Sequence, residues 1–492
     1  MAQEMIRGLI GGLRAKLEGN SDPKLEEELP YAAMMITLMA ASGVSPYESF
    51  RRLRSVDALE RFREEGDQIV RQVEVLGNDP LTAMERRSDE TKSKAYSEFL
   101  EGYVSSVKSG GSIVAYLTSK LRGIFDLRAA RAQHDIERLE TLVEGYMIML
   151  IVIFSFYILS MVTSTASAIT MSGGAFPDTS AFVYPLVLFV IPLFSVFFTY
   201  IANNIRPSTL RGMKKIYVLG FAPFVVFAAV MAAIMIVPQL SFIQSMVEPS
   251  LIMTAGLVAI SVPPSITYMR IARKNFSAEN AMPSFLRDVT EARRTGLPPE
   301  KSIIHAARRR GYGPFTSELR RIINQIEWGV SLRKIYGDLK VWIRSWPVIV
   351  DFLILVETIE IGGGDAKTLG ILAEFSEKSQ TIEKSQRDML KPYVILPFVW
   401  TILMAFTITF TSYTMSVIPL ALPAGGPKIP SSFPIIEAAI VFHTWLSGFF
   451  IGKVSEGNLA SGFKYSAILA LIAYVTLFLS KMMVGSIFRG LM

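Results

Sequence analysis

The sequence predicts an all-α, polytopic helical membrane protein that has about seven transmembrane helices and two repeated cytoplasmic helical bundles. Of its 492 residues, 51% are hydrophobic, and the mean hydropathy is +0.38, which is high for a soluble protein. The apolar residues gather in runs long enough to cross a bilayer as helices. The charged segments between these runs show no alternation with period two, so no strands are predicted.

Charged and apolar segments divide the chain into four parts. An N-terminal bundle covers residues 1–144, and a second bundle covers 270–391. A membrane block of four spans covers 145–269, and a block of about three spans covers 392–492. In the first bundle, helices are predicted over residues 29–42, 46–54, 57–76, 80–108 and 112–144. Residues 1–17 have helical spacing and are expected either to cap this bundle or to lie on the membrane surface.

The loops between the spans assign the sides of the membrane. The loops 163–180 and 238–250 contain no Lys or Arg, whereas Arg206, Arg211, Lys214 and Lys215 lie in the loop 202–215. The positive-inside rule therefore places that loop and both bundles in the cytoplasm. It leaves the C-terminus outside, where Lys481 and Arg489 run against the rule. The seven predicted spans are 145–163, 181–201, 216–237, 251–269, 393–418, 434–451 and 465–479.

The two bundles share a pattern of prolines and glycines at a constant separation of 253 residues. Pro30 and Pro283 are expected to open a helix, Gly43 and Gly296 to end it in the left-handed conformation, and Pro46 and Pro299 to start the next. Each bundle then has a glycine pair before a new helix. Shared spacing of this kind is typical of an internal repeat. The paired glycines are Gly110 and Gly111 in the first bundle and Gly362 and Gly363 in the second.

A proline-initiated helix, a glycine turn, a second proline-started helix and then a Gly-Gly break before a long helix that enters the membrane resemble the type II secretion system F domain. Two copies separated by several spans resemble the archaeal branch of that family. The resemblance implies a multi-pass platform protein of the cytoplasmic membrane for an archaellum or an archaeal type IV pilus-like filament. It further implies docking of a hexameric secretion ATPase, contact with pilin-like subunits, and a homodimer. The first copy has Lys108 where the second has Glu360.

A cluster of basic residues opens the second bundle and is the candidate docking site for the ATPase. Two other interpretations stay open: a solvated face, and contact with anionic lipid headgroups. If the cluster is instead a docking surface for an acidic partner, its cations would raise the rate of association and fix the register of the bound partner. Nucleic acid is not expected as a partner, because no aromatic–basic interleaving accompanies the cluster. Its members are Arg308, Arg309, Arg310, Arg320, Arg321, Arg333 and Lys334.

No catalytic, cofactor or metal site is expected, and the protein is predicted not to be an enzyme. Cys is absent and only three His are present, which disfavours thiolate chemistry and multi-His metal sites. The glycine run 362–368 departs from the phosphate-loop pattern and is interpreted as a helix break. Glu437 and His443 lie in a predicted span. They are interpreted either as a proton-relay or transport site or as residues with only a local structural role. The alternative function, a solute transporter, would place its repeats inside the membrane.

Overall fold

The computed structural model describes residues 22–169, 186–236, 247–362, 364–417 and 433–489. Every regular element in these ranges is a helix, which confirms the all-α prediction. Seven helices among the described residues are long and apolar enough to cross a membrane, as the sequence predicts. The predicted helix over 1–17, Gly363 and most of the loops 163–180, 238–250 and 419–433 lie outside the described residues.

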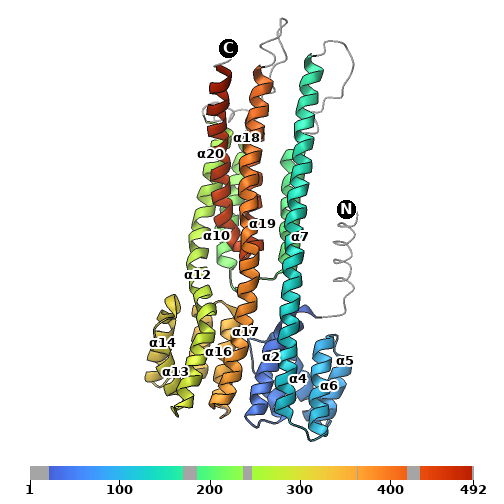
Figure 1. Cartoon of the computed structure of the whole chain (residues 1–492), viewed down its shortest axis with the longest axis vertical. Helices are drawn as coiled ribbons and strands as arrows, with labels where there is room; N and C mark the ends of the chain where they lie inside the picture. The colour runs from blue at the N-terminus through green and yellow to red at the C-terminus, as the bar shows by residue number, and fades with distance from the viewer. Residues whose placement is uncertain (1–21, 170–185, 237–246, 363, 418–432, 490–492) are drawn as a thin grey trace. The chain divides into compact units, whose positions relative to one another are not determined.

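The chain forms two compact units, each assembled from two separate segments. Unit 1 combines Met1–Ala132 with Lys274–Glu383, and unit 2 combines Gln133–Arg273 with Lys384–Met492. The chain passes from one unit to the other within helices α7, α12 and α17. Figure 1 shows α7 as one long ribbon without a break. The bounds of these helices are Ile113–Ile169, Pro249–Arg294 and Ala366–Leu390.

The first copy of the repeat lies in unit 1 and consists of α2 to α6 and the start of α7. The predicted helix over 80–108 is wrong, because the structure has two helices there. The hydroxyl of Ser93 accepts a hydrogen bond from the Tyr96 backbone N–H at 3.4 Å and so caps a new helix. The helices are α2 (Pro23–Ala41), α3 (Pro46–Leu53), α4 (Glu60–Glu74), α5 (Pro80–Glu90) and α6 (Lys94–Lys108).

The second copy repeats this order in the same unit. It starts with the end of α12 and finishes with the start of α17. The helix pairs α3 and α13, and α7 and α17, begin 253 residues apart, which confirms the predicted repeat. The intervening elements are α13 (Pro299–Ala307), η3 (Gly313–Phe315), α14 (Thr316–Glu327), α15 (Leu332–Trp342) and α16 (Trp346–Glu360).

Backbone conformation refines the alignment of the two copies. Gly43 and Gly296 have φ of 80° and 86°, which confirms the predicted left-handed turns. The later turn glycines, Gly77 with Gly329 and Gly110 with Gly362, also have positive φ but lie 252 residues apart. The second copy is therefore one residue shorter between α14 and α15, and it regains that residue before α17.

Two proline predictions are wrong. Pro30 lies inside α2 and Pro283 lies inside α12, so neither opens a helix. In α2 the start signal lies earlier, where the Asp22 carboxylate accepts from the Lys24 backbone N–H at 3.1 Å ahead of Pro23. Pro30 is fully surrounded by the core, and this packing offsets the hydrogen bond that an interior proline loses. By contrast, Pro46 and Pro299 begin α3 and α13 as predicted.

One hydrophobic core runs through both copies, so that unit 1 is an intramolecular pair of bundles. Helix α2 of the first copy packs against α16 of the second. The rings of Tyr31 and Trp346 meet edge to face, with their centroids 4.8 Å apart. The indole N–H of Trp346 donates to the Ala58 carbonyl at 2.9 Å. Phe125 and Phe375, one from each copy, also pack together, with their centroids 4.9 Å apart.

Unit 2 is built around α19, whose membrane-length segment is largely buried. Helices α9, α18 and α20 pack around it. The backbones of α19 and α20 approach closely, because a Cβ at Gly448 would lie 2.3 Å from the Ser466 nitrogen. Small residues allow such approaches between membrane helices. The elements are η1 (Leu186–Val190), α9 (Ile191–Ile205), α10 (Lys214–Ile236), η4 (Lys391–Val394), α18 (Ile395–Val417), α19 (Phe433–Glu456), η6 (Leu459–Ser461) and α20 (Gly462–Arg489).

Candidate partner-docking surface

The predicted basic cluster lies on the outer face of the second copy, and all seven side chains are exposed. Arg308, Arg309 and Arg310 follow directly on α13, Arg320 and Arg321 lie on α14, and Arg333 and Lys334 lie in the first turn of α15. The cluster is thus spread over three successive helices. The structure does not gather the seven side chains into a single site.

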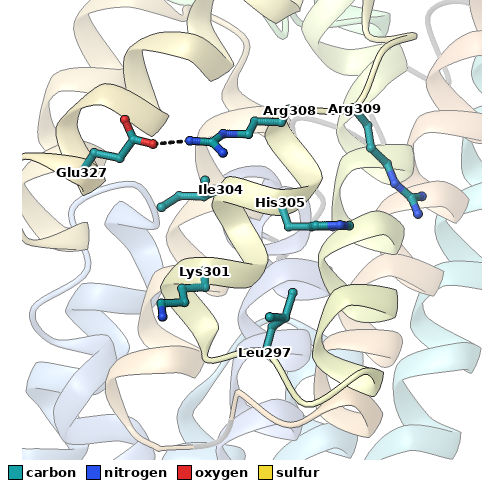
Figure 2. A pocket seen from close by; sticks show the side chains of 7 residues that line it. All are labelled: Leu297, Lys301, Ile304, His305, Arg308, Arg309 and Glu327. Carbon is teal, nitrogen blue, oxygen red and sulfur yellow. Dashed lines mark hydrogen bonds and ion pairs between the residues drawn. The ribbon is translucent and has the colours of Figure 1, made fainter.

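Two members of the cluster line a surface pocket of about 640 Å³ (Figure 2). Sequence reasoning missed Lys301 and His305, which also line it. Lys301, Ile304, His305 and Arg308 are three or four residues apart, which is the spacing of residues on one face of a helix. From this spacing the sequence could have predicted that Lys301 and His305 lie beside Arg308. The pocket residues are Leu297, Lys301, Ile304, His305, Arg308, Arg309 and Glu327.

Arg308 and Glu327 form an ion pair across this pocket. A guanidinium nitrogen of Arg308 lies 2.5 Å from a carboxylate oxygen of Glu327. Figure 2 shows the Arg308 side chain directed at Glu327, whereas Arg309 extends away from it. Both partners are well exposed, so water screens the pair and it contributes little to folding.

Arg309 is held more firmly than Arg308. It pairs with Asp288 of α12, which also accepts a hydrogen bond from the hydroxyl of Tyr312. The same hydroxyl lies 3.1 Å from the Ala306 carbonyl. Burial, followed by the neighbouring Asp288, raises the pKa of Tyr312 well above its usual range. Arg309 therefore helps to anchor the turn that joins α13 to η3.

Arg321 and Arg333 also have internal partners. Arg321 lies 3.4 Å from Glu318, and its guanidinium lies 5.2 Å from the centroid of the Trp342 ring. Arg333 pairs with Glu357 and with Glu360, the acid that precedes the glycine break. These two arginines hold α14, α15 and α16 together, and they are less available to a partner than the sequence suggests.

The side chains of the other three members of the cluster are not paired with any residue that the structure describes. Arg310, Arg320 and Lys334 form no side-chain ion pair or hydrogen bond there, and the same holds for the side chain of Lys301 in the pocket. Unpaired, exposed cations keep their charge available to an external anion. The candidate surface therefore consists chiefly of Lys301, Arg308, Arg310, Arg320 and Lys334.

The helix break that the sequence predicts within residues 362–368 lies between the end of α16 at Glu360 and the start of α17 at Ala366. Gly362 has φ of 83°, and the carboxylate of Asp365 accepts from the Thr368 backbone N–H at 3.0 Å. Asp365 therefore caps α17. The backbone carbonyl of Gly364 accepts from Arg293.

The ionisable residues of α19 are engaged in local contacts. Glu437 pairs with Lys481 of α20 at 2.7 Å, a partner that the sequence analysis did not connect with it. The Nε2 of His443 lies 3.4 Å from the Tyr146 hydroxyl, which also lies 2.7 Å from the Ser447 hydroxyl. No hydrogen bond or ion pair joins Glu437 to His443 among the described residues. In the described ranges, no group of three or more His, Asp or Glu is arranged to hold a metal ion.

Comparison with known proteins identifies the repeat. The model of the family "Type II secretion system (T2SS), protein F" matches residues 32–161 and again 285–411. The two matches cover both copies in unit 1 and the first membrane span that follows each. An uncharacterized protein of Methanocaldococcus jannaschii is similar over 483 residues, with 23% identity, and the alignment covers 92% of this chain and 79% of that protein. No solved structure matches the chain. Since the family model covers just over half of the sequence, the chain belongs to the type II secretion system protein F family and contains two copies of its domain.

Proposed function

We propose that the protein is the membrane platform on which an archaeal type IV pilus-like filament or an archaellum is assembled. Unit 1 would face the cytoplasm and bind a hexameric secretion ATPase, and unit 2 would contact pilin-like subunits in the bilayer. The observation that carries this proposal is the continuity of α7 and α12, since each contains residues of both units in one helix. A helix transmits displacement along its axis, so motion imposed on unit 1 would reach the membrane helices.

Three further points support the proposal. Proteins of the T2SS F family are platform proteins of the membrane and are not enzymes. The similar protein of M. jannaschii comes from an archaeon and aligns over nearly the whole chain. The second copy carries unpaired cations on its surface, which suit an acidic partner. As the family resemblance implies, we propose that two chains form a homodimer, which light scattering on the purified protein would test.

Orientation can be tested with single cysteines, because the chain has no Cys of its own. Ser55 and Ser331 are exposed in unit 1, and we expect cysteines there to react with an impermeant reagent only after the cells are permeabilised. Cysteines at Ser172 and Gln244 should react in intact cells, because those loops contain no Lys or Arg. Labelling at position 331 in intact cells would contradict the proposed orientation.

ATPase docking can be tested by charge reversal. Changing Arg308, Arg310 and Arg320 together to Glu should weaken binding of the secretion ATPase in detergent by more than about tenfold, because repulsion replaces attraction. Binding by the unaltered protein should also weaken as salt rises. A matched control reverses the exposed Arg63, Lys92 and Lys94 of the first copy and should leave binding unchanged. If the triple reversal alters only association with anionic lipid vesicles, the basic face contacts lipid and the docking proposal is wrong.

A further inference from the structure

The pocket on the second copy combines positive charge with apolar surface. Lys301, Arg308 and Arg309 supply three cations around it, and Leu297 and Ile304 supply apolar contacts. Glu327 is the single acid in the lining (Figure 2). Such a mixture suits a ligand that is acidic on one side and apolar on the other.

Glu327 already occupies the place that an external carboxylate would take. It comes from α14 and reaches Arg308 at the end of α13, at 2.5 Å. Water reaches both side chains, so the pair is weak. A second carboxylate that approaches Arg308 can therefore replace Glu327, which would then turn towards solvent.

An apolar anchor lies directly beside this acid. Trp328 follows Glu327 and is 86% exposed, although Trp side chains are usually highly buried. Its counterpart in the first copy, Val75, is also 76% exposed. Both copies thus expose a large apolar side chain at the end of the same helix, but only the second copy has a Trp there, next in sequence to the pocket residue Glu327. Trp and Arg are the residues most often found at the energetic centre of protein interfaces.

We propose that this pocket binds an acidic, amphipathic helical segment of a soluble protein. Its carboxylates displace Glu327 from Arg308 and contact Lys301, and its apolar face covers Ile304 and Trp328. The proposal rests on the docking function proposed above, and it adds the place, the chemistry of the bound segment and an internal competitor. Glu327 then sets the affinity by holding Arg308 until the partner arrives.

The first copy offers no equivalent site, so we expect one segment per chain. The positions that correspond to Lys301 and Arg308 are Glu48 and Ser55. Glu48 is already paired with Arg51 and Arg52. The counterpart of Glu327 is Glu74, which accepts a hydrogen bond from the Tyr47 hydroxyl at 2.8 Å instead of pairing with an arginine. Glu74 therefore provides a matched control position.

The test uses the full chain in detergent micelles and a fluorescent helical peptide with Glu on one face and Leu on the other. We expect saturable binding of one peptide per chain and no binding of a peptide with Lys in place of Glu. Glu327→Gln should tighten binding about two- to fivefold, the range set by one exposed ion pair. Arg308→Glu should weaken it at least about tenfold, and Glu74→Gln should leave it unchanged. Bound peptide should also protect Trp328 from acrylamide quenching, and this protection should be lost in Trp328→Ala.

Several outcomes would overturn the proposal. Unchanged or weaker binding by Glu327→Gln would show that Glu327 supports the site instead of competing for it. Equal peptide binding by Arg308→Glu would place the peptide elsewhere. If the secretion ATPase binds the unaltered chain but the peptide neither binds nor competes with it, the pocket proposal fails while the proposed function stands. If the peptide binds but the ATPase does not, the pocket proposal stands and the proposed function fails.

Discussion

The two copies of the repeat have the same helices but use their surface charges differently. In the first copy the acids are neutralised internally: Asp67 is held by Arg54 and Arg71, and Asp57 is held by Tyr336 and Lys340 of the second copy. In the second copy the corresponding side chains are unpaired cations. The pairs of equivalent positions are Glu48 and Lys301, Asp57 and Arg310, and Asp67 and Arg320.

The interiors of the copies, by contrast, share a buried acid. Glu65 in α4 and Glu318 in α14 are equivalent, and both are buried. Arg87 binds Glu65 with two hydrogen bonds of 2.7 Å. Glu318 is bound by Lys274 at 2.7 Å and by Arg321 at 3.4 Å. The buried charge is thus common to both copies, whereas the cation that neutralises it comes from a different helix in each. At this position the copies share a buried acid, whereas the three surface positions above have opposite charges in the two copies.

The shared core gives the largest expected effect. Phe375→Ala removes a fully buried ring that packs on Phe125 of the other copy, and it should lower the free energy of unfolding by about 3–5 kcal/mol. Because one core joins the copies, hydrogen exchange should accelerate in both α2 and α16. Val341→Ala, at an exposed position, should change stability by less than about 0.5 kcal/mol. Faster exchange confined to the second copy would show that the copies fold independently.

Removing the cation that pairs with the buried acid should destabilise the protein more in the first copy, at Glu65, than in the second, at Glu318. Arg87→Ala leaves Glu65 buried without its bidentate partner, and a charge left unpaired in this way destabilises by about 3–5 kcal/mol. Lys274→Ala should be milder, because Arg321 still lies near Glu318. Thermal unfolding of the two variants in detergent would rank them. Equal losses would mean that Arg321 does not stabilise Glu318.

A buried carboxyl that only the second copy has should make its stability depend on pH. Asp351 occupies the α16 position that corresponds to Phe99 of α6. Burial raises the pKa of Asp351 to about 7, although the Ser376 hydroxyl and Arg128 oppose the shift. The folded protein therefore binds this proton more tightly than the unfolded chain does. The stabilisation is complete below about pH 4 and is lost as pH rises through about 7, on the order of 4 kcal/mol in all.

Asp351→Asn tests this dependence, because an amide does not titrate. Unfolding of the two proteins between pH 4 and 8 should show a falling stability for the unaltered chain and a flatter profile for the variant. Hydrogen exchange should locate the difference in α16. A variant with the same pH profile as the unaltered chain would show that another group is responsible.

Local signals in the sequence predicted the fold, whereas contacts between helices could not be predicted. Span length and the turn glycines Gly43 and Gly296 depend on a few neighbouring residues, so they were predicted correctly. The prediction that Pro30 opens a helix was wrong because its burial in the shared core outweighs the backbone hydrogen bond that an interior proline loses. Burial of this kind is a property of the packed bundle and cannot be predicted from neighbouring residues. The internal contacts of the basic cluster could not be predicted for the same reason. The partners of Arg309 and Arg333 lie 21 and 24 residues away along the chain and become neighbours only when the bundle packs.

The smallest effect is the most direct test of the difference between the copies. Asp67 and Arg320 are equivalent, but Asp67 has two internal cations at 3.0 and 2.7 Å and Arg320 has no ion-pair partner among the described residues. Asp67→Ala should lower the free energy of unfolding by about 0.5–1 kcal/mol, because surface pairs contribute little each. Arg320→Ala should change it by less than about 0.5 kcal/mol.

Binding of the secretion ATPase should show the opposite ranking. Arg320→Ala removes a cation of the proposed docking surface and should weaken binding up to about fivefold at low salt, with less effect as salt rises. Asp67→Ala should leave binding unchanged, since its charge is used within the first copy. Measuring unfolding and binding on the same two variants separates the two roles. If Arg320→Ala destabilises the fold as much as Asp67→Ala does, then Arg320 has a structural partner, and the charge of the second copy is not free for docking.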